Sequence, residues 1–106
     1  MIDVTLGESD DPNVVLKLQA EAWELNIWAP ITELARLRDI RNADWNSRRS
    51  LQIGVCANAS VHWAVNGEQA HILVGQDDET WDLGVTIPLS TVDEIVSEVE
   101  QFQPES

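Results

Sequence analysis

Basic residues are missing from the second half of this 106-residue chain, which has no lysine or arginine after Arg49 although acidic residues continue to its end. The whole sequence holds 19 acidic and 6 basic residues, a formal net charge of −13 at pH 7. Such a surface repels phosphate backbones and anionic lipid headgroups. The charge therefore argues against nucleic acid and membranes as partners. It favours a basic protein partner, or serves solubility alone.

Cysteine and long apolar runs are also scarce. The single cysteine, Cys56, excludes an intramolecular disulfide, and its apolar neighbours predict a small buried residue rather than a nucleophile. No apolar run approaches the length of a membrane span, and the first eleven residues lack a signal-peptide pattern. We therefore expect a cytoplasmic protein.

Apolar residues are present in the amount that a folded domain needs. They make up 43% of the chain and include five tryptophans, enough for one core. No repeat, low-complexity tract or linker divides the sequence. We expect a single domain over residues 1–106, with a frayed tail at 103–106.

Alternating apolar and polar residues predict strands near residues 2–6, 51–55, 61–65, 71–74 and 80–87. Asn66-Gly67 predicts a hairpin with a type I′ turn, and a second turn is expected at Asn58. Apolar residues at helical spacing predict a helix from a Thr32 cap to Ile40 and another after a Ser90 cap. Residues 41–50 are polar and predict a loop.

Residues 14–28 fit two structures. Their alternation changes phase near Ala22 and Trp23, which favours one long strand with a bulge. A helix capped by Asp11 is the alternative, but it would point Leu16 and Trp23 at solvent. With the strand, the predicted fold is α+β: an antiparallel β-meander of five to six strands with two helices packed on one face. The predicted order is β-β-α-β-β-β-β-α.

Residues that could perform catalysis or bind a metal are few. His62 and His71 lie on the two arms of the predicted hairpin, nearly opposite each other, but a metal site needs three or four ligands. The sequence contains no glycine-rich phosphate loop and no CxxC or HExxH pattern. We expect a protein that is not an enzyme and that carries no cofactor or metal.

The most distinctive segment combines consecutive carboxylates with a tryptophan at residues 77–82. An exposed indole beside carboxylates suits an arginine or lysine of a partner protein. Calcium binding, a solvated turn, or burial of the tryptophan under the last helix are the alternatives. The predicted partner-binding residues, with one acid expected nearby on the hairpin, are Asp77, Asp78, Glu79, Trp81, Asp82 and Glu68.

These features give the chain a resemblance to the small immunity proteins of bacterial contact-dependent inhibition and other polymorphic toxin systems. The resemblance rests on size, acidity, the α+β meander and the tryptophan-acid segment, over about residues 23–101. It implies a non-catalytic inhibitor that binds and blocks a cognate toxin domain in the cytoplasm. We expect the toxin to be basic and this chain to be a monomer or a weak homodimer. Two alternatives remain. One is an acidic nucleic-acid mimic that inhibits a DNA- or RNA-binding protein. The other is a small metal-binding or enzymatic domain that uses His62 and His71.

Overall fold

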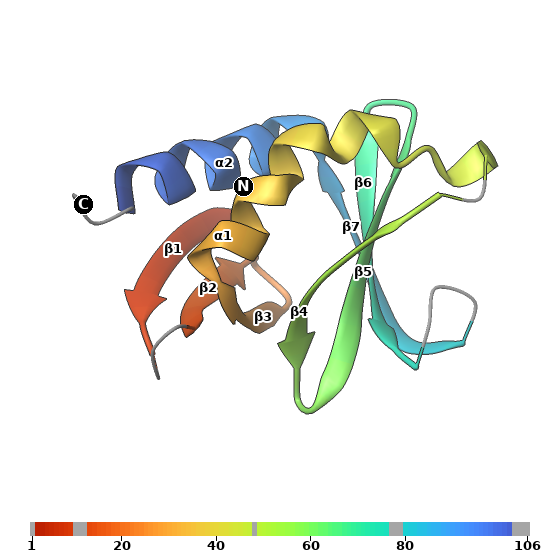
Figure 1. The fold of residues 1–106 in the computed structure, drawn as a ribbon. Helices are drawn as coiled ribbons and strands as arrows, with labels where there is room; N and C mark the ends of the chain where they lie inside the picture. The colour runs from red at the N-terminus through yellow and green to blue at the C-terminus, as the bar shows by residue number, and fades with distance from the viewer. Residues whose placement is uncertain (1, 10–12, 48, 77–79, 103–106) are drawn as a thin grey trace.

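The computed structural model describes residues 2–9, 13–47, 49–76 and 80–102. Seven strands form one antiparallel sheet whose spatial order follows the chain (Figure 1). The strands are β1 (Asp3–Glu8), β2 (Asn13–Gln19), β3 (Glu24–Pro30), β4 (Leu51–Cys56), β5 (Ala59–Asn66), β6 (Gln69–Gly75) and β7 (Trp81–Pro88). The helices are α1 (Ile31–Leu34), η1 (Ala35–Asn42), η2 (Trp45–Ser47) and α2 (Leu89–Phe102). The α+β class is thus confirmed, with seven strands where five to six were expected.

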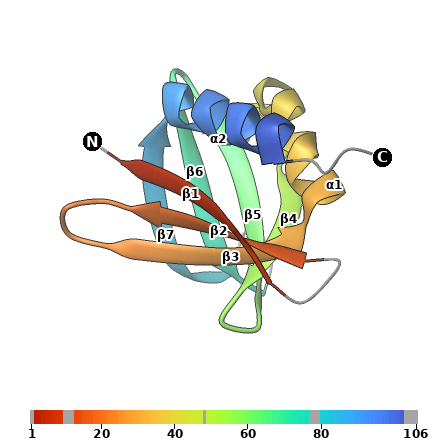
Figure 2. The same cartoon turned by 90° about the vertical axis from the view of Figure 1, so that its left-hand side faces the viewer.

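Both main helical segments lie on the same face of the sheet, as the sequence predicts. The sheet curls so that α2 packs against both edge strands, β1 and β7, as well as against η1 (Figure 2). Apolar side chains of the two helical segments meet the inward side chains of the strands in one core. The helical residues buried there are Leu34, Leu37, Ile40, Val92, Ile95 and Val99. None of the described helices is long and apolar enough to cross a membrane.

The segment at residues 14–28 is extended, but it forms two strands instead of one. Residues 20–23 make a tight turn in which the Ala20 N–H donates to the Trp23 carbonyl at 2.8 Å. The change of phase that predicts a bulge is therefore a change of strand. Leu16 and Leu18 on β2 and Leu25 and Ile27 on β3 all face the core. The predicted strand order and the helical alternative are both wrong here.

The two predicted hairpins of the second half form, with different turns from those expected. Between β5 and β6 the turn residues are Gly67 and Glu68, and of the two only Gly67 has a positive φ, as at the first position of a type II′ turn. Between β4 and β5 both Ala57 and Asn58 have positive φ, which is the type I′ pattern. The type I′ turn therefore lies one hairpin earlier than predicted.

The helix starts also differ from the predicted caps. Helix α1 begins at Ile31 after Pro30, without a side-chain cap, so Thr32 lies inside it. Helix α2 begins at Leu89, so Ser90 lies inside its first turn. Most of the predicted first helix is the 3₁₀ segment η1, and short 3₁₀ structure also occurs within the predicted loop at 41–50. An exposed bidentate pair between Arg41 and Asp93 (3.1 Å) joins η1 to α2 and raises the pKa of the Arg41 guanidinium.

The ladder between β3 and β4 is the shortest in the sheet, because Trp28 and Val55 form the only pair described there. The register of β4 against β5 shifts between Gln52 and Val55, so Ile53 and Gly54 have no ladder partner. Side chains satisfy their backbone groups instead. The Trp63 indole N–H donates to the Ile53 carbonyl at 3.1 Å, and the Gly54 N–H donates to Glu33 Oε1 at 2.8 Å.

Candidate functional site

Trp81 lies on the face of the sheet opposite α1, η1 and α2. A regular strand would place it on the same side as Leu83 and Ile87, because all three have the same parity. The register of β6 against β7 shifts, so that Val74 pairs with Leu83 but Gly75 pairs with Trp81. This extra residue turns the indole away from the core. The expectation that Trp81 could be buried under the last helix is therefore wrong, and its side chain is 45% exposed.

The Trp81 indole packs against Gly84 and Leu73. A Cβ on Gly84 would lie 2.9 Å from Trp81 Cζ3 and 3.3 Å from Leu73 Cδ2. The ring, the leucine and the bare backbone therefore meet in one place. Since Gly84 has no side chain, the indole can lie flat along the strand and keep one side toward solvent.

A groove of about 280 Å³ runs beside this indole. Trp45 of η2 and His71 also line it, and His71 Nδ1 lies 3.0 Å from the Thr86 hydroxyl. Two indoles thus border one groove. Trp45 was not among the predicted site residues. A tryptophan inside an otherwise polar segment, residues 42–47, is the sequence signal that could have identified it.

The structure describes only part of the predicted partner-binding set. Asp77, Asp78 and Glu79 lie outside the described residues. Asp82 is exposed next to Trp81. Glu68 is also exposed, but it lies in the β5–β6 turn, where its carbonyl accepts from the Leu89 N–H at 3.0 Å. That is the opposite end of β7, about 20 Å from Trp81 at the usual rise of a strand. The expectation that Glu68 lies near the tryptophan-acid segment is therefore wrong.

The two histidines share the outer face of the sheet without standing opposite each other. His62 pairs with Leu73, and His71 pairs with Ala64, so the histidines are diagonal neighbours. His62 is 6% exposed, and its Nε2 has no hydrogen-bond partner among the described residues. Within the described ranges, no three His, Cys, Asp or Glu side chains group as a metal ligand set.

Cys56 is half-buried at the end of β4. Burial raises the pKa of its thiol, with a smaller opposing effect from a backbone hydrogen bond of Asn26. A raised pKa keeps the sulfur protonated at neutral pH, whereas nucleophilic cysteines need the thiolate. This environment agrees with a packing role for Cys56.

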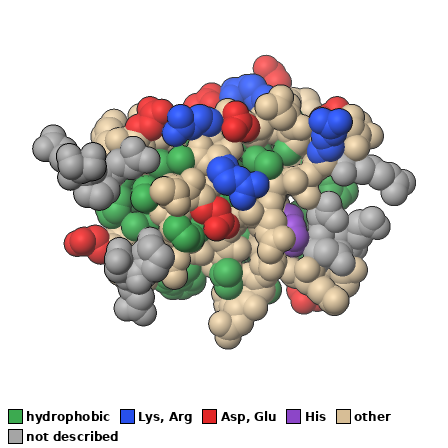
Figure 3. All heavy atoms as spheres, in the orientation of Figure 1, with side chains coloured by type: hydrophobic (Ala, Val, Ile, Leu, Met, Phe, Trp, Pro, Cys, Tyr) green, Lys and Arg blue, Asp and Glu red, His purple; other side chains and the backbone are tan. Residues whose placement is uncertain are grey.

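The described acidic residues do not form a single surface. Four of them lie on α2, where Asp93 pairs with Arg41, while Asp82 lies at the far end of β7. On the face shown in Figure 3, lysine and arginine side chains alternate with acidic ones along the helical side of the molecule. The helical side is therefore mixed in charge. Strand β7, by contrast, contains no lysine or arginine.

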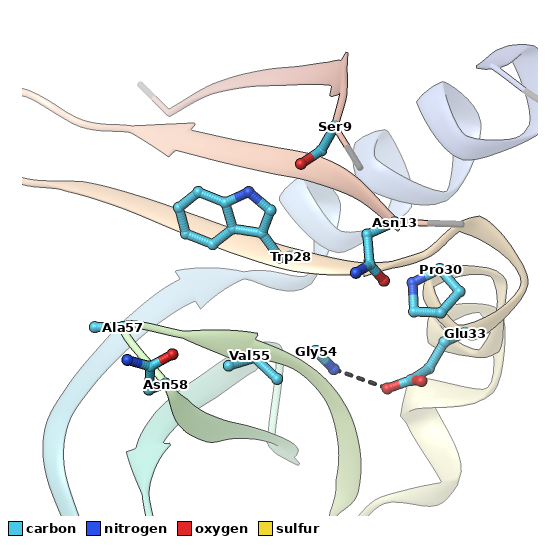
Figure 4. Close-up of a pocket in the computed structure, with 9 residues that line it drawn as sticks. All are labelled: Ser9, Asn13, Trp28, Pro30, Glu33, Gly54, Val55, Ala57 and Asn58. Atoms are coloured by element: carbon cyan, nitrogen blue, oxygen red, sulfur yellow. Dashed lines mark hydrogen bonds between the residues drawn. The ribbon is translucent and has the colours of Figure 1, made fainter. Parts of the chain in front are cut away.

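A second groove, of about 550 Å³, lies at the narrow β3–β4 contact. Trp28 and Val55 supply its exposed apolar surface, at 40% and 44% exposed. Figure 4 shows Glu33 of α1 at one end and the turn of Ala57 and Asn58 at the other. This groove was not predicted from the sequence. Its signal is that Trp28 shares the outward phase of β3 with polar Glu24 and Asn26.

A substitution at Gly84 tests whether the Trp81 ring packs against this residue. Gly84→Ala places a methyl group against the indole, so we expect Trp81 to be displaced while the free energy of unfolding changes by less than about 1 kcal/mol. Labelling with 5-fluorotryptophan gives one ¹⁹F resonance per tryptophan, and that of Trp81 should shift most. Gly7→Ala is the matched control, because its Cβ meets only Val15 at an ordinary 3.5 Å. An unmoved Trp81 resonance would show that the ring does not lie on Gly84.

No protein-family model matches the chain, and neither the curated proteins nor the solved structures searched include a match to it.

Proposed function

We propose that this protein is a non-catalytic inhibitor that binds and neutralises a basic protein, and that its target is a cognate bacterial toxin domain in the cytoplasm. The observation that carries the proposal is the position of Trp81. The register shift in β7 holds a large apolar ring half-exposed on the side away from the helices. Large aromatic side chains of this kind dominate the binding energy of protein interfaces.

The surroundings of Trp81 suit a cationic partner. Asp82 follows Trp81 in the sequence and is exposed, and three further acids precede Trp81 at residues 77–79. Trp81 and Trp45 both line the groove, and an arginine or lysine can stack on an indole ring. A net charge of −13 speeds the encounter with a basic protein at moderate salt. Inhibition by this means requires a rigid surface and no catalytic group.

Capture of the target from a lysate of the source organism tests the proposal. The tagged chain is immobilised and washed at low and at moderate salt, and retained proteins are identified by mass spectrometry. We expect one basic protein to survive the moderate-salt wash, and its activity to fall when the chain is added. Retention of only abundant basic proteins that wash off together would contradict the proposal and leave the charge as a solubility feature.

A further inference from the structure

We propose that the groove at the β3–β4 contact is a second recognition site, and that it binds an arginine side chain of the basic partner. The inference rests on the proposed function for the class of partner, but the site is argued from its own geometry. In this arrangement the guanidinium meets Glu33, and the methylene stem lies over Trp28 and Val55.

Glu33 is placed to receive a cation. Its carboxylate is partly buried, and Oε1 accepts the Gly54 N–H at 2.8 Å, which fixes the orientation of the group (Figure 4). Among the described residues no lysine or arginine forms an ion pair with it. Arg36, one turn further on, donates to the Gln52 carbonyl at 3.4 Å instead. The second carboxylate oxygen is left to bind a guanidinium, and such charge-assisted bonds are strong.

The backbone at Gly54 makes the groove a defined site. Gly54 has a φ of +88°, and a Cβ there would lie 2.4 Å from Ile27 Cγ2. Only glycine fits this close approach, and it brings the N–H under Glu33. The carboxylate and the backbone beneath it therefore have one arrangement before any ligand arrives, which lowers the entropy lost on binding.

The rest of the groove suits the remainder of an arginine-bearing segment. Trp28 and Val55 offer exposed apolar surface for the stem, since arginine buries its methylene groups while its head remains polar. The amide side chains of Asn13 and Asn58 border the groove and can bond to a partner backbone. A volume of about 550 Å³ is within the roughly 300–1,000 Å³ range of ligand sites. Among the described residues that line the groove, Glu33 carries a carboxylate and none is a cation.

A small arginine peptide tests this site without any partner. The probe is N-acetyl-Ala-Arg-Ala-amide, titrated into the ¹⁵N-labelled protein to tens of millimolar. We expect saturable shifts of the Gly54 N–H and the Trp28 indole N–H. The same peptide with citrulline, which has the same shape without the charge, should bind at least about 10-fold more weakly, because it cannot form a charged pair with Glu33.

Variants assign the binding to the groove. Glu33→Gln keeps an oxygen for the Gly54 N–H but removes the charge, and should weaken the peptide about 10-fold. Glu98→Gln on α2, an equal change of charge at another half-buried glutamate, should have no effect. Val55→Thr keeps the shape of the groove and should weaken binding a few-fold without involving Glu33.

Equal binding of the arginine and citrulline peptides, unchanged affinity in Glu33→Gln, or shifts confined to Trp81 would each overturn the site. Because the peptide is measured in the absence of a partner, any of these results would leave the groove lined by Trp81 and Trp45, and the proposed function, untested and intact. Conversely, peptide binding in a chain that captures no target would support the groove alone.

Discussion

Trp63→Ala is expected to lower the free energy of unfolding by about 3–5 kcal/mol, the usual effect of truncating a buried aromatic side chain. Trp63 is fully buried and is among the largest side chains of the core. Its indole N–H donates to the Ile53 carbonyl at the point where the β4–β5 ladder is interrupted. The truncation therefore removes packing and also leaves a buried carbonyl without its donor.

Urea unfolding followed by far-UV circular dichroism measures this effect without relying on tryptophan fluorescence. With a dependence on urea of about 2 kcal/mol per molar, the midpoint should fall by about 2 M. Trp63→Phe retains most of the ring but not the N–H, and should lower the stability by about 1–3 kcal/mol. Trp81→Ala is the surface control and should change it by less than about 1 kcal/mol. Equal effects of Trp63→Ala and Trp81→Ala would contradict the placement of Trp63 in the core.

The parts of the fold that could be predicted from the sequence are those fixed by periodicity. Val92, Ile95 and Val99 recur at helical spacing and are buried in α2. Val61, Trp63 and Val65 alternate and are buried in β5, with His62 on the opposite face. Such patterns can be recognised in the sequence because burying one face of a helix or strand requires apolar residues at a fixed spacing. That spacing identifies both the type of element and the face that points to the core.

Two neighbouring strands with opposite phase look like one strand with a bulge. That ambiguity accounts for the missed β2–β3 hairpin, since its turn at residues 20–23 contains neither glycine nor proline. Without a strong turn signal, the sequence does not show where β2 ends and β3 begins. The helix starts were missed for a related reason: α1 follows Pro30 without a side-chain cap, and α2 begins directly after Pro88.

The candidate site was predictable in composition but not in geometry. Trp81 and Asp82 stand out in sequence, yet strand alternation does not decide which face Trp81 takes, and the register shift against Gly75 turns it outward. The contributions of Trp45 and Gly84 depend on contacts between distant segments. Glu68 was expected beside this segment because the β5–β6 turn and β7 are close in the chain. In an antiparallel hairpin, however, the turn before β6 and the start of β7 lie at opposite ends.

Trp81→Ala is expected to weaken binding of the captured target by at least about 30-fold, or about 2 kcal/mol, as for a central aromatic anchor. The indole is half-exposed in the free protein, so its truncation removes contact area for the partner while leaving the core intact. Isothermal titration calorimetry gives the affinity, and the urea experiment above verifies the fold of the variant. An affinity within threefold of the wild type would exclude Trp81 as an anchor.

The acids next to Trp81 in the sequence are expected to act mainly on the rate of association. Neutralising Asp78, Glu79 and Asp82 together, by Asn or Gln, should lower the association rate constant about 10-fold at low salt and reduce its salt dependence. The matched control replaces Glu94, Glu98 and Glu100 of α2 by Gln, the same change of net charge on the helical side. Surface plasmon resonance at 50 and 300 mM salt separates the two. Equal losses in both variants would mean that the target responds to overall charge, whereas a loss confined to the first variant assigns recognition to the Trp81 surface.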